Sequence, residues 1–353
     1  MIKPRKSVMD MEEYKPPTSG RENYLKLDFN ENTKGCSPNV IKALRKIRNQ
    51  GLVAYPEYGK LKESLAKYCK VNINEILPTN ATDEAIKTVI ETYIEKGKDE
   101  IIIPVPTFAM FRFYAQLNEA IIKEICYNRD LTFPTNKVLD EINKKTKIVV
   151  IVNPNNPTGT SVNYEDIIKI LEKAKKDDSI VLIDEAYYQF YGKISIPLIK
   201  RYDNLIVLQT FSKAFGLAGA RLGYIISNEN NIKIMQKVLS PYSVNSLASA
   251  CGQAALKDLN YVKRYVKGVE ESKKILYKSL NSLNIEYYKS DANFVLLSIG
   301  KKSGYFCKNL KENGILVRDR SSDPLLDGCV RVTVGTKKQT LQLIRALRLV
   351  VRK

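Results

Sequence analysis

The 353-residue chain contains no histidine. This absence excludes every mechanism that needs a catalytic or metal-binding histidine from this chain, including Ser-His-Asp triads. A mechanism based on a lysine amine remains available. The six cysteines show no Cys-x-x-Cys spacing, so they predict reduced, buried thiols of a cytoplasmic protein and no metal site or disulfide framework.

The chain also has no apolar run near its beginning. Met1 to Tyr24 is basic and contains prolines, so we expect neither a signal peptide nor a membrane span there. Acidic residues are too few to balance the basic ones, and the formal net charge is +19. Because the basic residues are spread along amphipathic helical patterns such as 41–49 and 261–280, and no nucleic-acid module motif occurs, we expect no nucleic-acid partner. The positive field could instead steer phosphorylated substrates.

The stretch from Thr210 to Tyr224 has the most informative chemistry in the sequence. Lys213 follows two hydroxyl residues, Thr210 and Ser212, and Arg221 comes eight residues later. A lysine amine captures an aldehyde when it is held in one place and partly deprotonated, and two hydroxyls with a guanidinium suit a phosphate dianion. This combination indicates a site for pyridoxal 5'-phosphate (PLP). Taken alone, a solvated lysine in a glycine-rich loop explains the stretch equally well.

A carboxylate suited to the cofactor's ring nitrogen follows another strand. Residues 179–183 have the pattern of a buried strand and lead directly into Asp184, with Tyr187 three residues later. Open α/β sheets place functional groups at the carboxyl ends of their strands, and a carboxylate there would keep the ring nitrogen protonated. Tyr187 could reach the ring's phenolic oxygen. For Asp184 alone, an ordinary acidic residue that begins a turn is the simpler interpretation.

Two further strand ends suit the same ligand. The apolar strand 147–152 leads into the rigid turn Asn153–Gly159, which would either aim the Asn156 amide at the ring oxygen or merely end the strand. Another strand leads into a helix near Asn80, whose free N–H groups and positive dipole end suit a phosphate. A capping box with Asn80 or Thr82 as the cap explains the same residues and is compatible with that role.

Alternating strands and helices predict an α/β protein with a mostly parallel seven-stranded sheet flanked by helices, plus a smaller α/β domain. We expect a large cofactor-binding domain at 41–257 and a small domain formed by 1–40 and 258–353. A long helix at 258–284 would connect them. Sheet strands are expected at 76–79, 101–104, 120–126, 147–152, 179–184, 205–209 and 222–226, and small-domain strands at 285–289, 293–299 and 328–334. In the large domain the clearest helices are expected at 163–176 and 229–239, and a further helix is expected at 243–257. In the small domain helices are expected at 303–313 and 337–350.

Together these strand ends and their order resemble the fold-type I PLP-dependent enzymes of the aspartate aminotransferase superfamily, and more closely the histidinol-phosphate aminotransferases. The resemblance covers nearly the whole chain. The matching stretches are Tyr14 with Gly20–Glu22, Leu27–Asn32, Tyr55–Pro56, Asp83–Glu84, Pro106–Phe108, Asn153–Gly159, Asp184–Tyr187, Thr210–Tyr224, Ser290–Phe294, Gly314–Asp319 and Gly328–Gly335.

The resemblance implies a role for each matching residue at the cofactor ring. Lys213 would form the Schiff base and move a proton at the substrate Cα. Asp184 would pair with the pyridine nitrogen, and Asn156 and Tyr187 would hold the ring oxygen. Phe108 would lie on the ring face.

The resemblance also implies a homodimer with shared active sites and gives roles to residues around the phosphate and the substrate. Arg331 would bind the carboxylate of glutamate in one half-reaction and the acid or phosphate of the acceptor in the other. The cofactor phosphate would be held by the backbone of Thr82 and Asp83, the side chains of Thr210, Ser212 and Arg221, and Tyr55 from the neighbouring subunit.

Two positions depart from the pattern of the histidinol-phosphate aminotransferases. Their Glu-Asn-Pro-Tyr-Gly stretch is Glu31–Gly35 here, with Lys34 in place of the aromatic residue that would shape a pocket for an imidazole. Lys34 and Asn32 are candidate substrate-binding residues. A smaller or more anionic substrate and a solvated loop explain Lys34 equally well. The usual glycine of the phosphate turn is Ala81, whose methyl group is tolerated if its φ is negative.

The sequence therefore predicts a cytoplasmic PLP-dependent aminotransferase that moves an amino group from a donor such as L-glutamate to a small phosphorylated carbonyl acceptor. A decarboxylase of phosphoserine or phosphothreonine shares these motifs, since the protein selects the reaction by the bond at Cα that it orients. A non-catalytic binding protein with the same fold is a third possibility. The intact lysine, aspartate and arginine set argues against it, because binding alone needs no Schiff base.

Overall fold

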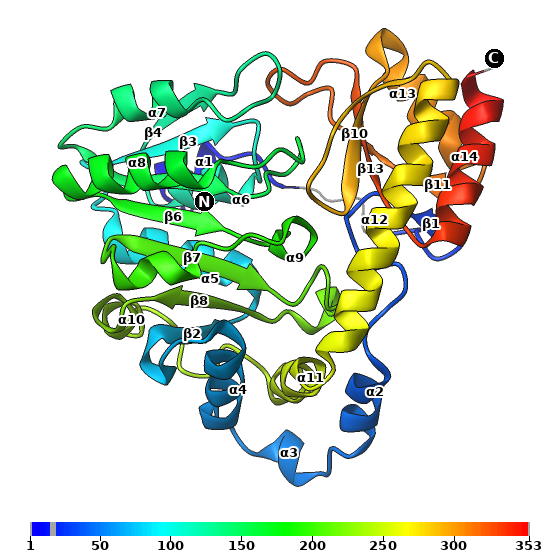
Figure 1. Cartoon of the computed structure of the whole chain (residues 1–353). Coiled ribbons are helices and arrows are strands. Elements are labelled where there is room, and N and C mark those ends of the chain that lie inside the picture. The colour runs from blue at the N-terminus through cyan, green and yellow to red at the C-terminus, as the bar shows by residue number, and fades with distance from the viewer. Residues whose placement is uncertain (1, 15–18, 352–353) are drawn as a thin grey trace.

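A seven-stranded sheet in the order β2-β8-β7-β6-β5-β3-β4 forms the larger part of the molecule in the computed structural model, which describes residues 2–14 and 19–351 (Figure 1). Strands β3 to β7 run parallel to one another, whereas β8 is antiparallel to both of its neighbours, β2 and β7. The predicted mostly parallel seven-stranded sheet is confirmed. Its strands are β2 (Ile76–Thr79), β3 (Glu100–Val105), β4 (Ile121–Cys126), β5 (Thr146–Val152), β6 (Ile180–Asp184), β7 (Leu205–Thr210) and β8 (Gly223–Ser227).

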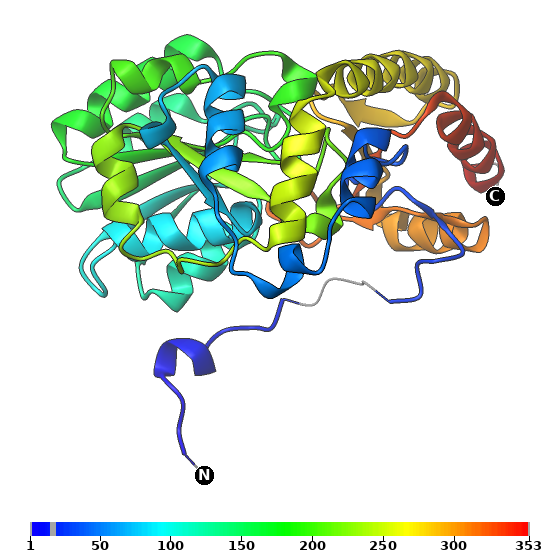
Figure 2. The ribbon, with the colours of Figure 1, turned by 90° about the horizontal axis from the view of Figure 1, so that it is seen from below.

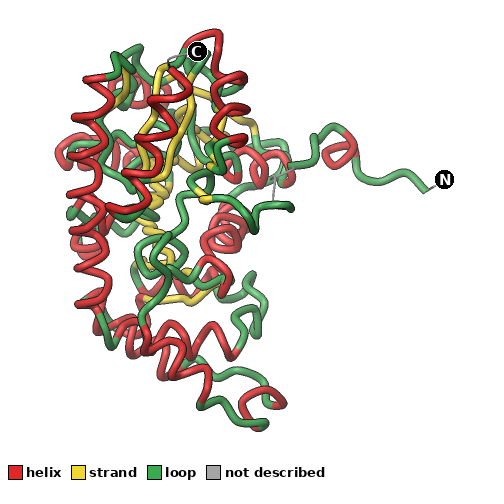
Figure 3. Tube along the Cα trace, turned by 90° about the vertical axis from the view of Figure 1, so that its right-hand side faces the viewer, coloured by secondary structure: helices red, strands yellow, loops and turns green. Residues whose placement is uncertain are grey.

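The central strands are nearly continuous apolar runs because helices cover both faces of the sheet. Every residue of β6 and β7 is buried. On one face the core is completed by α5 (Ala81–Tyr93), α6 (Met110–Leu117) and α10 (Glu229–Met235). On the other face it is completed by α4 (Gly59–Cys69), α7 (Thr135–Glu141), α8 (Tyr164–Lys176) and α11 (Ser246–Leu256). Figure 3 shows the strands inside and the helices around them.

A second, antiparallel sheet of four strands in the order β12-β13-β10-β9 lies beside the first. The two-residue strand β1 pairs in parallel with β11, so the segment that follows residue 24 joins this part of the chain. The 24-residue helix α12 runs from the end of the seven-stranded part to the four-stranded sheet (Figure 1). The elements here are β1 (Leu25–Lys26), β9 (Glu286–Tyr288), β10 (Phe294–Ser298), β11 (Ile315–Leu316), β12 (Arg318–Asp319), β13 (Cys329–Thr333), α12 (Leu259–Ser282), α13 (Ser303–Glu312) and α14 (Lys337–Val351).

Two helices end or begin elsewhere than the sequence predicts. The helix expected at 229–239 ends at Met235, and the helix expected to begin at 243 begins at Ser246, where the Asn245 side chain accepts a hydrogen bond from the Ala248 N–H. That cap fixes the first turn three residues later than expected. The remaining short helices are α1 (Lys6–Met9), α2 (Pro38–Arg45), α3 (Gln50–Val53) and α9 (Tyr188–Tyr191), with 3-10 turns at Ile73–Glu75, Ile196–Lys200, Ala218–Ala220 and Gly300–Lys302.

The N-terminal residues extend away from the body of the molecule (Figure 2). Arg5 Nη2 donates a 3.4 Å hydrogen bond to the Leu117 carbonyl at the end of α6. Among the described residues no helix has both the length and the apolar character needed to cross a membrane.

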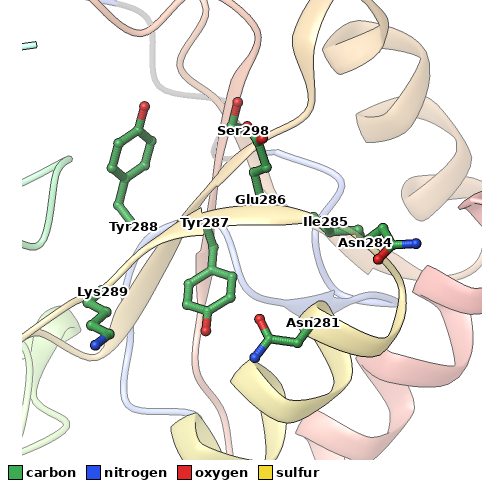
Figure 4. Close-up of a pocket in the computed structure, with 8 residues that line it drawn as sticks. All are labelled: Asn281, Asn284, Ile285, Glu286, Tyr287, Tyr288, Lys289 and Ser298. Carbon is green, nitrogen blue, oxygen red and sulfur yellow. The ribbon is translucent and has the colours of Figure 1, made fainter. Parts of the chain in front are cut away.

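A surface cavity of about 700 Å³ lies along β9 at the free edge of the four-stranded sheet (Figure 4). None of the residues predicted to bind the cofactor or the substrate lines it. It is lined by Asn281, Asn284, Ile285, Glu286, Tyr287, Tyr288, Lys289 and Ser298. The predicted chemistry therefore belongs to a different place, at the strand ends of the larger sheet.

Candidate functional site

The carboxyl ends of three parallel strands bring the predicted ring-binding groups together. Asp184, the last residue of β6, lies between Val152 of β5 and Leu208 of β7 in the sheet register. Asn156 follows the end of β5, and Lys213 follows the end of β7. The predicted convergence of these strand ends follows from their parallel order in the sheet.

The Lys213 amine is held in place by hydrogen bonding and packing. Its Nζ donates a 3.1 Å hydrogen bond to the Phe29 carbonyl and lies 5.6 Å from the centroid of the Tyr187 ring. Asn32 Nδ2 donates to the Ala214 carbonyl at 3.0 Å, which fastens the 32–35 loop beside the lysine. None of the ion pairs among the described residues includes Lys213, so its amine is not committed to a carboxylate.

Asp184 is a buried carboxyl group with one hydrogen-bond partner among the described residues. Its side chain is 2% exposed, and Oδ1 accepts a 2.9 Å hydrogen bond from the Ala186 N–H. Burial raises the pKa of Asp184 to about 7, against the opposing effects of the Ala186 hydrogen bond and the positive charge of Lys213. A cation beside this carboxyl group would favour its charged form, as a protonated ring nitrogen requires.

Tyr187 and Asn156 present hydrogen-bond donors near the same place. The Tyr187 hydroxyl oxygen accepts a 3.0 Å hydrogen bond from Asn30 Nδ2, which leaves its own proton to be donated. Asn156 Oδ1 accepts a hydrogen bond from Arg331 Nη1, so the Asn156 amide turns its NH₂ group away from that arginine. Two donors are thus available for a ring oxygen.

A close approach of backbone segments builds the candidate phosphate cradle. Gly223 of β8 pairs with Thr79 on one side and with Thr210 on the other. A Cβ atom at Gly223 would lie 2.7 Å from the Ala81 carbonyl carbon and 2.8 Å from the Thr82 nitrogen, so only glycine lets the start of α5 come this close. Thr210 Oγ1 donates to Ser212 Oγ at 3.0 Å. The free N–H groups of α5 and both hydroxyls therefore gather at one point.

The beginning of α5 differs from two sequence expectations. Ala81 has a φ of 62°, so the negative φ at which its methyl group would be tolerated is not adopted, and the left-handed conformation strains a non-glycine residue. The Asn80 side chain makes no cap hydrogen bond. Instead the Glu84 carboxylate accepts from the Asn80 N–H at 2.6 Å. Arg221 is ion-paired with Asp83 beside this turn, which places its guanidinium at the cradle.

Arg331 is a buried guanidinium without a carboxylate partner among the described ion pairs. It is 6% exposed, and its Nη atoms donate to Asn156 Oδ1 and to the Asp28 carbonyl. Its Nε has no hydrogen-bond partner. Burial lowers the pKa of Arg331 to about 10. An anionic ligand could accept a hydrogen bond from Arg331 Nε and would also balance the charge of the guanidinium.

Two further arginines lie near Arg331, and the sequence interpretation gave neither a role. Arg318 of β12 is the cross-strand partner of Arg331 in the antiparallel register. Arg320 forms an ion pair with Asp323, and its side chain is 17% exposed. The positive charges of Arg320 and Arg318 both contribute to lowering the pKa of Arg331. No sequence signal predicted this pairing, because no strand was expected at β12 (Arg318–Asp319).

The other predicted residues lie around the rim of this site or beyond it. Asn32 Oδ1 accepts from the backbone N–H groups of Lys34 and Gly35, so the structure gives Asn32 a role in shaping its own loop. The exposed Lys34 places Nζ 5.1 Å from the centroid of the Tyr261 ring.

Phe108 and Tyr55 follow different elements, β3 and α3. The half-buried Phe108, three residues beyond β3, packs edge-on to Phe111 with 6.4 Å between ring centroids. Tyr55 is 76% exposed and stacks on Tyr242 at 4.4 Å. Within one chain Tyr55 makes no hydrogen bond to the residues of the phosphate cradle.

The residues present fit PLP in three respects. The buried Asp184 carboxyl group has no cationic hydrogen-bond partner and would suit a protonated ring nitrogen, the close approach at Gly223 would suit a phosphate, and the Lys213 amine donates to a carbonyl rather than to a carboxylate. The family comparison agrees, because the chain matches the family Aminotransferase class I and II over residues 22–347. The chain belongs to this family.

Relatives and solved structures are consistent with this aminotransferase assignment. The chain is 39% identical over 328 residues to the histidinol-phosphate aminotransferase of Caldanaerobacter subterraneus subsp. tengcongensis, covering 92% of each chain. It shares its fold with the histidinol-phosphate aminotransferase of Sinorhizobium meliloti, solved in complex with pyridoxal-5'-phosphate, at a TM-score of 0.89 and 22% identity over 98% of this chain and 97% of that one. It also matches the L-threonine-O-3-phosphate decarboxylase of Porphyromonas gingivalis at a TM-score of 0.81 and 26% identity, over 93% of this chain and all of that one.

These findings confirm the predicted aspartate aminotransferase-like fold, the PLP-dependent aminotransferase activity and the PLP cofactor. The roles of the individual site residues stay predictions.

Proposed function

We propose that this aminotransferase takes an amino group from L-glutamate and transfers it to a small phosphorylated carbonyl compound of the kind that the histidinol-phosphate aminotransferases use. The observation that carries the proposal is an excess of positive charge at a group of three neighbouring arginines, Arg331, Arg318 and Arg320. Among the described ion pairs only one includes any of them, the pair between Arg320 and Asp323. Guanidinium groups bind phosphate dianions bidentately. The same group would accept the single charge of a donor carboxylate in the other half-reaction.

PLP, when bound, supplies the electron sink that weakens the bonds at the substrate Cα. In this proposal the Lys213 Nζ would accept the proton from the substrate Cα and deliver it to the C4' carbon of the cofactor. The Asp184 carboxylate would keep the proton on the ring nitrogen, while Asn156 and Tyr187 would donate hydrogen bonds to the ring oxygen. Phe108 would lie against the ring face and restrict its position.

The remaining predicted residues would bind the ends of the ligands. Arg331 would bind the anionic group of the substrate and so fix the orientation of the substrate. That orientation would decide which bond at Cα is placed for cleavage. Lys34 extends the positive field at the rim, held near the site by Asn32. The phosphate of the cofactor would be held by the backbone of Thr82 and Asp83 and by the side chains of Thr210, Ser212 and Arg221.

The proposal includes a cytoplasmic homodimer in which Tyr55 reaches the phosphate of the partner's site. Exposed apolar side chains gather around α3, where Leu52 is 64%, Val53 67% and Tyr55 76% exposed, and Tyr242 stacks there at 53% exposure. A second copy of the chain would cover them. We also propose the division into a large domain at 41–257 and a small domain formed by 1–40 and 258–353.

The test is the donor half-reaction followed by a set of phosphorylated acceptors. Holoenzyme mixed with L-glutamate should lose its long-wavelength absorbance and release 2-oxoglutarate, and a phosphorylated carbonyl compound should restore the absorbance. Arg318→Ala should raise KM for the phosphorylated acceptor by roughly 10- to 100-fold, the loss of one charged hydrogen bond, and should raise KM for glutamate less. Arg201→Ala is the matched control, because its guanidinium is 67% exposed and pairs with Glu172 on α8.

A second candidate function is favoured by the likeness to the threonine-phosphate decarboxylase. Release of carbon dioxide from phosphothreonine or phosphoserine, without the change in absorbance on adding glutamate, would replace the transamination proposal with decarboxylation. Equal effects of Arg318→Ala on glutamate and on the phosphorylated acceptor would contradict the assignment of the arginine group to the phosphate.

A further inference from the structure

Three consecutive residues, 28 to 30, hydrogen-bond to three different groups of the candidate site. The Asp28 carbonyl accepts from Arg331 Nη2, and the Phe29 carbonyl accepts from Lys213 Nζ at 3.1 Å. Asn30 Nδ2 donates to the Tyr187 hydroxyl at 3.0 Å. The segment follows β1, which belongs to the smaller part of the molecule, so it carries contacts from that part into the site.

Asn30 is the most tightly held residue of this segment. It is 1% exposed and has a φ of 57°, a left-handed conformation that asparagine adopts more readily than most residues. Its N–H donates to Thr333 Oγ1 at 3.0 Å, and its carbonyl accepts from Asn293 Nδ2 at 3.0 Å. Thr333 at the end of β13 and Asn293 just before β10 therefore fix its backbone from two sides.

The hydrogen bonds also fix which way the Asn30 amide points. Thr333 Oγ1 accepts from the Asn30 N–H, so its single proton is free to be donated to Asn30 Oδ1, 3.2 Å away. The amide oxygen is thereby held toward Thr333, and the NH₂ group is held toward Tyr187. Because the Tyr187 oxygen accepts a hydrogen bond from Asn30 Nδ2, the phenol's own proton must point elsewhere.

We propose that Asn30 is a positioning residue, which directs the Tyr187 phenol proton toward the cofactor's ring oxygen and is itself oriented by Thr333. The inference rests on the PLP site of the proposed function. Thr333 lies two residues after Arg331 on β13, so the strand that holds the substrate-binding arginine also holds the residue that orients the phenol. The site is therefore assembled across both sheets, through Asn30.

The test changes the hydrogen-bond donor of residue 30 into an acceptor. Asn30→Asp keeps the shape and the left-handed preference of the residue but replaces the NH₂ donor with an acceptor. The nearby charges of Lys213 and Arg331 favour the ionised form of the new carboxyl group. The phenol proton would then be donated to residue 30 and withdrawn from the ring oxygen.

The protein with PLP bound at Lys213 is titrated with base, and its visible absorbance is followed. The quantity measured is the midpoint, the pH at which the change in absorbance is half complete. A hydrogen bond to the ring oxygen draws negative charge from the ring, so the lysine nitrogen holds its proton less strongly. Loss of that bond in Asn30→Asp should raise the midpoint by about one pH unit or more, a tenfold change equal to about 1.4 kcal/mol. Thr333→Val should shift it in the same direction, and Thr333→Ser, which keeps the hydroxyl, should restore it.

The control is Asn309→Asp, the same chemical change at a buried asparagine of α13 whose Nδ2 donates to the Tyr305 carbonyl at 2.8 Å. Its midpoint should equal that of the wild type. An unchanged midpoint in Asn30→Asp overturns the inference and leaves the proposed function standing. If Asn30→Asp does not fold, an unchanged midpoint in Thr333→Val has the same meaning. A wild-type protein without visible absorbance in the presence of PLP would overturn both.

Discussion

Replacing Asp184 with asparagine should stabilise the protein without cofactor while weakening its response to the cofactor. The carboxyl group is fully buried at the end of β6, and its hydrogen-bond partner is the Ala186 N–H. An amide keeps the shape and can still accept that hydrogen bond through Oδ1. Asp184→Asn therefore removes the charge of residue 184 and little else.

The magnitude follows from the pKa of the buried group. Burial raises the pKa of Asp184 from 3.8 to about 7, which corresponds to a cost of roughly 4 kcal/mol for the ionised form in the folded state. Between these values the unfolded chain has released the proton and the folded protein has kept it. The free energy of unfolding of the wild type therefore falls as the pH rises through this range. The advantage of Asp184→Asn should grow by about 1.4 kcal/mol per pH unit and level off above about pH 7.

The assay is urea unfolding of both apoproteins at about pH 5 and pH 8, repeated with saturating PLP. The expected advantage of Asp184→Asn is larger at pH 8 by roughly 3 kcal/mol. With PLP the wild type should gain more stability than the variant, because a neutral amide does not pair with a protonated ring nitrogen. Asp178→Asn, at a side chain that is 97% exposed, should change stability by less than about 0.5 kcal/mol.

Two results would refute this reasoning. An advantage of Asp184→Asn that does not grow between pH 5 and pH 8 would show that burial does not raise the pKa of this carboxyl group. An equal gain from PLP in both proteins would show that Asp184 is not the partner of the ring nitrogen.

Two further predictions concern the phosphate cradle. Gly223→Ala should lower the free energy of unfolding by more than about 2 kcal/mol and weaken PLP binding in a fluorescence titration, because the new Cβ would lie 2.7 Å from the Ala81 carbonyl carbon. Gly219→Ala, whose Cβ meets no atom within 4 Å, is its control, and wild-type PLP affinity in Gly223→Ala would disprove the cradle. Ala81→Gly should raise the urea midpoint by relieving a φ of 62°, a net gain of up to about 1 kcal/mol; a lower midpoint would show that the left-handed conformation is not strained.

The sequence predicted the strands of the larger sheet closely because strands buried on both faces have unbroken apolar runs. Strands β5, β6 and β7 begin or end within one residue of the expected positions. Lys213, Asp184 and Asn156 were proposed as site residues for the same reason, since each lies at or shortly after the end of such a run. Helix ends were less well predicted, because the spacing of apolar residues does not show where a helix is capped. The cap at Asn245 and the end of α10 at Met235 depend on local hydrogen bonds.

The sequence by itself determined which chemistry to expect: an amine, a carboxylate and candidate phosphate-binding groups near the ends of strands, with no histidine available for another mechanism. The tertiary structure alone decided how these groups are oriented. Asn30 is 157 residues from Tyr187 and 303 from Thr333, and Arg318 meets Arg331 only through strand register. A hydrogen bond between such distant residues depends on how two sheets pack together, and no local pattern of residue types specifies that packing.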